Sequence, residues 1–176
     1  MALAVVRCAR SGDACFLLTE RPATLNRHAG KFALPGGRLD PAETDEQAAL
    51  RELREELGLA VEPAAVLGRL DDFPTRSGFR MRPFVLWIED DSALAPDPTE
   101  VAHCFRVPLS DLFRQGIPIL REAPWSEHPV LSMHLASLDD EVHAPTAAVI
   151  YQFREVALAG RDTRVDHFEQ PRFAWC

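Results

Sequence analysis

The stretch of this sequence that decides the fold runs from Gly36 to Leu59 and reads GGRLDPAETDEQAALRELREELGL. Its second half has the pattern of an amphipathic helix. Thr44 can cap the N-terminus with Gln47 as its capping-box partner, and Gly58 is the residue expected just past the C-terminal end. At about 100° per residue, the apolar side chains share one arc of this helix; they are Ala49, Leu50, Leu53 and Leu57. We therefore predict a helix over residues 44–57.

The glutamates Glu52, Glu55 and Glu56 lie within one arc beside this apolar stripe. Like charges three or four residues apart repel by a few tenths of a kcal/mol in water, and by more where the site is partly desolvated. One interpretation is an ordinary solvated face, which is common in helices rich in Glu and Arg. The other is a site for a hard cation such as Mg²⁺, or Mn²⁺, which bridges carboxylates to substrate phosphates. A cation bound there would neutralise a diphosphate and activate water.

The spacing of the residues around these glutamates favours the cation site. The positions that form the pattern are Gly37, Glu43, Arg51, Glu52, Leu53, Glu55, Glu56, Gly58 and Leu59. This spacing resembles the Nudix box, over residues 37–59, at every specified position, and chance agreement is on the order of one in a hundred million per starting residue. The resemblance implies an α/β fold, a Nudix-type α/β/α sandwich whose mixed central sheet is flanked by helices. It also implies a hydrolase that cleaves a diphosphate bond with water.

The resemblance implies metal ligands and a general base. Glu52, Glu55 and Glu56 would ligate one or more divalent ions, together with the carbonyl oxygen of Gly36. Glu100 stands where a glutamate after the box often serves as an extra metal ligand or as general base, and a surface glutamate before a strand is the alternative. A general base needs only a carboxylate within reach of the water. Glu55, Glu56 and Glu100 therefore all stay open for that role.

Supporting roles follow from the same resemblance. Arg51 is placed in the catalytic set, and with Glu43 it would hold the loop against the helix and orient the ligands. Metal sites need such support from the residues around the ligands. The structural positions of the box are Gly37, Glu43 and Gly58.

The segment before the box, residues 17–37, reads LLTERPATLNRHAGKFALPGG. It is similar to the motif that precedes the box in coenzyme A diphosphatases, and the shared positions include Arg21, His28 and Gly30. It departs from that motif at Pro22, Asn26 and Leu34. The resemblance implies cleavage of coenzyme A or its derivatives to 4′-phosphopantetheine and adenosine 3′,5′-bisphosphate. The departures favour ADP-ribose or NADH as the alternative substrates.

Several arginines concentrate positive charge in an otherwise acidic chain. Guanidinium groups suit bidentate recognition of phosphate, although solvated hairpin arginines are the ordinary alternative for any single one. His28 either contacts the substrate or caps its loop. Other histidines, including His103 and His134, show no metal-ligand spacing and receive no role. The candidate substrate-binding residues are Arg21, Arg27, His28, Gly30, Arg76 and Arg80.

The rest of the chain shows strand and helix patterns without regular alternation, which favours a mixed sheet. A hairpin is predicted from residues 3–8 and 15–19, and residues 21–37 form a long loop. Further strands are predicted over residues 61–71, 79–89 and 101–107. Helices are predicted over residues 109–113 and 145–158, and residues 115–140 give no clear pattern.

Composition limits the classes of protein and of partner. The 176 residues are 47% hydrophobic, so we expect one domain over residues 1–176 with a C-terminal extension from about residue 116. The net charge of −8 argues against nucleic-acid binding, which relies on clustered Lys and Arg. The cysteines form no C-x-x-C pair, which indicates reduced, mostly buried thiols. The apolar stretch over residues 2–6 is too short for a signal or membrane segment.

The sequence therefore predicts a cytoplasmic enzyme whose partner is a small-molecule nucleoside-diphosphate derivative, with no nucleic acid, no membrane, and homodimer formation left open. The alternative from a different class is a Nudix-like nucleotide sensor that binds without cleaving. Such modules typically lose box glutamates, and all of these glutamates are present here.

Overall fold

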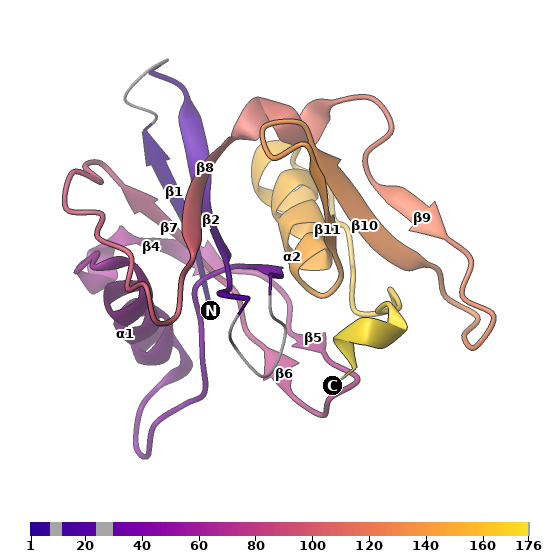
Figure 1. Cartoon of the computed structure of the whole chain (residues 1–176), viewed down its shortest axis with the longest axis horizontal. Helices are drawn as coiled ribbons and strands as arrows, with labels where there is room; N and C mark the ends of the chain where they lie inside the picture. The colour runs from indigo at the N-terminus through magenta and orange to yellow at the C-terminus, as the bar shows by residue number, and fades with distance from the viewer. Residues whose placement is uncertain (8–11, 24–29, 176) are drawn as a thin grey trace. The chain divides into compact units, whose positions relative to one another are not determined.

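The computed structural model describes residues 1–7, 12–23 and 30–175. The chain divides into two compact units (Figure 1). Unit 1 comprises Met1–Arg69 and Arg82–Leu109, and unit 2 comprises Leu70–Met81 and Ser110–Cys176. We describe each unit by itself, and a single domain over residues 1–176 stays a prediction.

The described part of unit 1 contains one six-stranded sheet. Its strands are β1 (Ala2–Arg7), β2 (Ala14–Glu20), β3 (Phe32–Ala33), β4 (Val66–Arg69), β7 (Phe84–Ile88) and β8 (His103–Pro108). The order along the sheet is β3-β2-β1-β7-β4. Strand β8 pairs with β2 along the edge opposite β1. Strands β1 and β7 run parallel, whereas the other pairs are antiparallel. The sheet is therefore mixed.

Helix α1 (Asp45–Leu57) packs against strand β1 of this sheet (Figure 1). The Thr44 hydroxyl accepts from the Gln47 N–H at 3.2 Å, and the Gln47 amide oxygen accepts from the Thr44 N–H at 2.8 Å. Gly58, with φ 71°, ends the helix and donates its N–H to the Arg54 carbonyl. The predicted helix and both of its caps are confirmed. The buried face of α1 contributes Ala49, Leu53 and Leu57 to a hydrophobic core. The sheet contributes residues that include Ala4, Leu17 and Leu86.

Unit 2 holds smaller elements. Within the described residues, strands β9 (Ile119–Arg121), β10 (Val130–Leu135) and β11 (Asp140–His143) form an antiparallel sheet in the order β11-β10-β9. Strands β5 (Phe73–Pro74) and β6 (Arg80–Met81) form a hairpin. Helix α2 (Thr146–Phe153) packs on β10 and β11 and continues as the π-helical turn η3 (Arg154–Leu158). The 3-10 turn η4 (Arg172–Ala174) follows near the C-terminus.

The predicted α/β fold class, with a mixed central sheet and helices, is confirmed. Several element boundaries were wrong. The first part of the strand predicted over residues 61–71 is instead the 3-10 turn η1 (Pro63–Ala65), where proline lacks the N–H that a strand ladder needs. The strand predicted over residues 79–89 is two strands, β6 and β7, which belong to different sheets. The short helix predicted over residues 109–113 has the expected bounds, as the 3-10 helix η2 (Leu109–Phe113).

Two further expectations concern cysteines and membranes. Cys15 is disulfide-bonded, so the expectation of reduced thiols is wrong for Cys15, because spacing along a chain does not report which thiols meet in space. Among the described cysteines, Cys104 is a free thiol, and burial raises its pKa to about 11. Within the described ranges, no helix has the length and apolar character needed to cross a membrane.

The left-handed end of helix α1 gives a stability prediction. A Cβ on Gly58 would lie 3.1 Å from the Ala95 Cβ, on a backbone with φ +71°. We expect Gly58→Ala to lower the free energy of unfolding by about 1 to 2 kcal/mol in urea titrations. Gly68→Ala is the control, because a Cβ there meets nothing within 4 Å and φ is ordinary. Equal stability of the two variants would contradict the strained cap.

Candidate active site

The loop before helix α1 lies directly on two carboxylates of that helix. The Gly36 N–H donates to Glu56 Oε1 at 3.1 Å. A Cβ on Gly37 would stand 2.1 Å from Glu52 Oε1, and a Cβ on Gly36 would stand 2.6 Å from the Met1 Cβ. Only glycine allows both approaches. The two glycines therefore bring the loop backbone to the acidic side of the helix.

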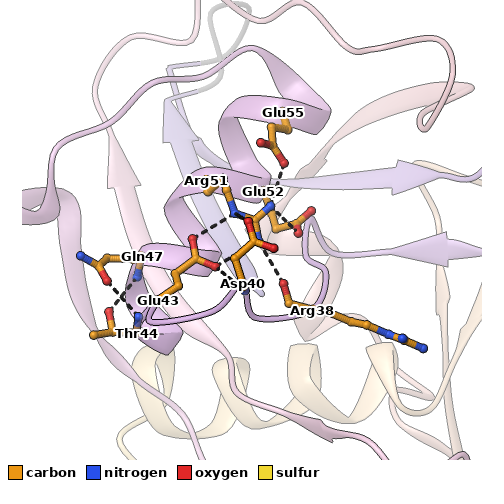
Figure 2. A network of polar contacts seen from close by, with 8 residues as sticks. All are labelled: Arg38, Asp40, Glu43, Thr44, Gln47, Arg51, Glu52 and Glu55. Carbon is orange, nitrogen blue, oxygen red and sulfur yellow. Dashed lines mark hydrogen bonds and ion pairs between the residues drawn. The ribbon is translucent and has the colours of Figure 1, made fainter.

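The guanidinium of Arg51 joins this loop to the helix (Figure 2). Its Nε donates to Glu43 Oε1 at 3.0 Å, and one terminal nitrogen donates to Glu52 at 2.8 Å and to Glu55 at 2.7 Å. The other terminal nitrogen donates to the Arg38 carbonyl oxygen at 2.9 Å. The hydrogen bond with Glu43 contributes most to raising the pKa of Arg51. One planar side chain thus fixes three carboxylates and the loop backbone.

A tight turn holds Glu43 ready for Arg51. The Asp40 N–H donates to Glu43 Oε2 at 3.0 Å, and the Glu43 N–H donates to the Asp40 carbonyl at 3.1 Å. Ala42, inside the turn, has φ 69°. The hydrogen bond from Arg51 is the largest cause of the lowered pKa of Glu43. Glu43 is therefore held in its charged form.

Glu56 and Glu52 are carboxylates with little access to solvent. Glu56 is 5% exposed, and burial raises its pKa to about 7. The Glu52 side chain is 12% exposed, and burial raises its pKa also. Negative charge from Glu100 acts on both groups in the same direction. Glu55, in contrast, is 49% exposed and contacts Arg51.

Glu100 approaches the helix because its loop is fastened to the last turn of α1. The Ala95 N–H donates to the Leu57 carbonyl and the Asp97 N–H to the Glu56 carbonyl, both at 2.9 Å. Asp97 Oδ1 then accepts from the Thr99 N–H at 2.8 Å and from its hydroxyl at 2.7 Å. The sequence analysis missed Asp97, although Asp-Pro-Thr is typical of a turn closed by an aspartate side chain.

Arg21 supplies a positive charge beside Glu56. Its charge lowers the pKa of Glu56, against the larger effect of burial. The Arg21 N–H donates to the Lys31 carbonyl and the Gly30 N–H donates to the Arg21 carbonyl, both at 3.0 Å. These hydrogen bonds join Arg21 to residues 30 and 31. The Nε of Arg21 is buried and finds no hydrogen-bond acceptor among the described residues. Buried donors of this kind are normally satisfied, so this atom fits an anionic ligand.

Other candidate residues belong to unit 2 or fall outside the described residues. Arg76 and Arg80 belong to unit 2. Arg76 donates to both carboxylate oxygens of Glu169, and Arg80 lies 3.7 Å from an Asp72 oxygen. Arg27 and His28 lie outside the described residues. Unit 1 therefore contains the described candidates Arg21, Gly30, Gly36, Gly37, Glu43, Arg51, Glu52, Glu55, Glu56, Gly58 and Glu100, and their roles remain predictions.

The donor set fits a hard divalent cation that keeps part of its water. In the described ranges, no cluster of three His, Cys, Asp or Glu side chains could hold an ion. Mg²⁺ commonly uses only one or two carboxylates, with waters and substrate phosphates as its other ligands. Glu56 is buried beside Glu52, and no described lysine or arginine forms an ion pair with it. A cation would offset this repulsion between like charges.

Solved structures with the same arrangement of sheet and helices are Nudix proteins. A Nudix hydrolase from M. smegmatis, RenU, matches with a TM-score of 0.58 and 21% identity, over 93% of this chain and 86% of that chain. A MutT/nudix family protein from Enterococcus faecalis matches with a TM-score of 0.56 and 19% identity, over 89% of this chain and 61% of that chain. At these identities the likeness establishes the fold. The chain belongs to the NUDIX domain family, whose sequence model matches residues 1–133.

Curated relatives extend the likeness in sequence. An "Uncharacterized Nudix hydrolase NudL" of Citrobacter koseri is 40% identical over 113 residues, which are 64% of this chain and 57% of the relative. The NudL protein of Pectobacterium atrosepticum is 36% identical over 140 residues, 77% of this chain and 71% of the relative. "Nudix hydrolase 3" of Caenorhabditis elegans is 36% identical over 104 residues, 57% of this chain and 43% of the relative. The chain thus spans between about two fifths and seven tenths of these relatives.

Removing the guanidinium of Arg51 tests how much this side chain contributes to the stability of the fold. Glu43 and Glu52, with side chains 13% and 12% exposed, would lose their cationic partner. We expect Arg51→Gln to lower the free energy of unfolding by about 2 to 3 kcal/mol, somewhat less than for a fully buried ion pair. Urea titration in EDTA measures the effect without metal. Arg54→Gln, an exposed change on the same helix, should have little effect, and an equal loss in both variants would refute the account.

The contact between Arg76 and Glu169 predicts a dependence of stability on pH. Glu169 is 4% exposed, and the hydrogen bond from Arg76 is the largest cause that lowers its pKa to about 2. A lowered pKa in the folded state stabilises the protein above the pKa of the unfolded state, and this contribution is lost as pH falls toward 2.

We therefore expect Arg76→Gln to destabilise the protein at pH 7 and to unfold at a higher pH during acid titration followed by circular dichroism. The control is Arg80→Gln, since the Arg80 side chain is 65% exposed. An unchanged acid transition in Arg76→Gln would show that the contact does not stabilise unit 2.

Proposed function

We propose that this protein hydrolyses the diphosphate bond of a nucleoside-diphosphate-linked metabolite, with one or more Mg²⁺ or Mn²⁺ ions that would take ligands from Glu52, Glu55 and Glu56 and keep water and substrate phosphate as their other ligands. The supporting observation is the glycine loop that lies on the acidic side of α1. The backbone of this loop contacts the carboxylates of Glu52 and Glu56, which are little exposed. The negative charge of Glu100 also raises the pKa of Glu56.

The cation, when bound, supplies positive charge for the diphosphate and lowers the pKa of water. The chain supplies position and a proton acceptor. The oxygen of water attacks one phosphorus, the bond from that phosphorus to the bridging oxygen breaks, and a glutamate takes the proton of the water. Glu55, Glu56 and Glu100 are the candidates for this base, which needs only a carboxylate within reach of the water.

Two groups have separate parts in binding. The buried Nε of Arg21, which has no acceptor among the described residues, would donate to a phosphate oxygen. Arg51 already contacts three carboxylates. We therefore give Arg51 the role of positioning Glu52 and Glu55, and Arg21 the role of contacting the substrate.

For the substrate, we propose coenzyme A or its derivatives, cleaved to 4′-phosphopantetheine and adenosine 3′,5′-bisphosphate. The proposal rests on the resemblance of residues 17–37 to the coenzyme A diphosphatase motif. Within this segment, the hydrogen bond from the Gly30 N–H to the Arg21 carbonyl holds two of the shared positions together. ADP-ribose and NADH are the second candidates because the segment departs from that motif at Pro22, Asn26 and Leu34. A sensor that does not cleave is disfavoured because the box glutamates are intact.

Activity assays with single substitutions test the metal site. We expect turnover to require Mg²⁺ or Mn²⁺, to stop in EDTA, and to fall about a thousandfold or more in Glu52→Gln and Glu56→Gln. Glu62→Gln, an exposed change outside the site, is the matched control and should keep full activity. Turnover that survives EDTA, or full activity in Glu56→Gln, would sink the metal assignment.

A substrate panel separates the candidate metabolites. Coenzyme A, an acyl-coenzyme A, ADP-ribose, NADH and a diadenosine polyphosphate are compared by kcat/KM under one metal concentration. We expect coenzyme A compounds to give the highest value. A higher kcat/KM for ADP-ribose or NADH would make that compound the proposed substrate in place of coenzyme A. No turnover of any compound would refute the proposed hydrolase activity.

A further inference from the structure

Three aromatic rings lie together on the face of the unit 1 sheet opposite helix α1. The register pairs Glu20 with both His103 and Phe32, on the two edges of β2. Paired residues share one face of a sheet, and alternate residues along a strand return to it. Phe105 therefore joins His103 on that face, whereas Cys104 points to the core on the α1 side.

These rings contact one another, and the imidazole of His103 is the most exposed of the three. The Phe32 and Phe105 centroids are 5.9 Å apart in an edge-to-face arrangement, and those of His103 and Phe105 are 6.0 Å apart. Phe32 and Phe105 are half-buried, and the His103 side chain is 69% exposed. Nδ1 of His103 lies 3.1 Å from a carboxylate oxygen of Glu20, which fixes the plane of the imidazole.

The chain places these rings next to the candidate active site. Phe32 precedes Gly36 by four residues, and His103 follows Glu100 by three. Three residues of extended chain span at most about 10 to 11 Å. The Ala102 N–H donates to the Glu20 carbonyl at 2.8 Å, so this short connection is held against β2. A nucleotide with its diphosphate beside Glu100 could therefore reach the rings with its base.

We propose that Phe32, His103 and Phe105 form a stacking surface for the purine base of the substrate, with Glu20 as acceptor for an amino group of that base. The ring planes are tilted by 71° and 41°, so the base would stack on the exposed imidazole of His103 and pack against the phenylalanines. The proposal rests on the proposed function for the position of the diphosphate. Aromatic side chains stack on the flat face of a base, whereas a sugar or pantetheine chain offers no such face. The carboxylate of Glu20, beside the exposed imidazole, adds an acceptor at the edge of the surface.

Binding of AMP, which has no diphosphate to cleave, tests this surface without turnover. Isothermal titration calorimetry on the full chain should give a dissociation constant for AMP that His103→Ala raises about tenfold to a hundredfold. His103→Phe, which keeps a stacking ring, should restore it to within about threefold. Ribose 5-phosphate, which lacks the base, should bind wild type and His103→Ala alike. The control His134→Ala changes an exposed histidine of unit 2 and should bind AMP as the wild type does.

Phe105→Leu provides a second, smaller change in case one variant folds poorly, and its AMP affinity should fall as well. With an adenine-containing substrate, the variants should raise KM and leave kcat close to wild type, because the rings bind substrate and transition state alike. Wild-type affinity for AMP in both His103→Ala and Phe105→Leu would overturn the proposal. AMP binding on this surface without hydrolysis of any diphosphate would refute the proposed function and leave the stacking surface standing.

Discussion

The hydrogen bonds of one guanidinium organise the candidate site. Arg51 contacts Glu43, Glu52 and Glu55 and the Arg38 carbonyl oxygen. The loop therefore cannot leave the helix without separating Arg51 from the Arg38 carbonyl and from the carboxylate of Glu43, whose side chain is only 13% exposed. A lysine could not serve in its place, because its ammonium group lacks the planar fork that reaches several acceptors at once. The position of the loop backbone over the acidic helix follows from this contact and from the two glycines.

The same arrangement leaves a charge imbalance that the described residues do not resolve. Arg51 compensates Glu43 and much of Glu52, but it does not reach Glu56, which burial and the neighbouring Glu52 and Glu100 make hard to ionise. Arg21 offsets part of this, and its buried Nε has no acceptor among the residues that the structure describes. A divalent cation and a phosphate are complementary to these two defects, one to the carboxylates and the other to the arginine. The site is therefore suited to the two charges that a metal-diphosphate pair carries.

Local rules explain what could be predicted from the sequence. Helix α1, with its capping box and its glycine end, depends on residues within a few positions of one another, so the sequence predicted it correctly. The need for glycine at residue 37 also follows a recognisable pattern, although its physical cause, the carboxylate of Glu52, is visible only in the structure. Periodicity alone favoured only a mixed sheet, whereas the family resemblance predicted the particular α/β fold.

Features that depend on distant partners could not be predicted. Arg76 meets Glu169, which lies 93 residues away, so its pairing has no signal in local sequence. Strand β10 is almost wholly buried and lacks the alternation that marks a half-exposed strand. The contact of the His103 ring with the Phe105 ring depends on the strand register, and the partner of the Asp97 N–H is the backbone of α1. These contacts are set by how the elements meet rather than by any element alone.

The central claim is that the acidic side of α1, beneath the glycine loop, binds a divalent cation. Crystals of the metal-free protein soaked in Mn²⁺ test it most directly, because anomalous scattering locates the ion without reference to any substrate. The account predicts an ion within about 2.0 to 2.4 Å of carboxylate oxygens of Glu52 and Glu56, and no ion there in Glu56→Gln. Mn²⁺ bound only elsewhere, with Glu52 and Glu56 left without a metal at saturating concentration, would contradict it.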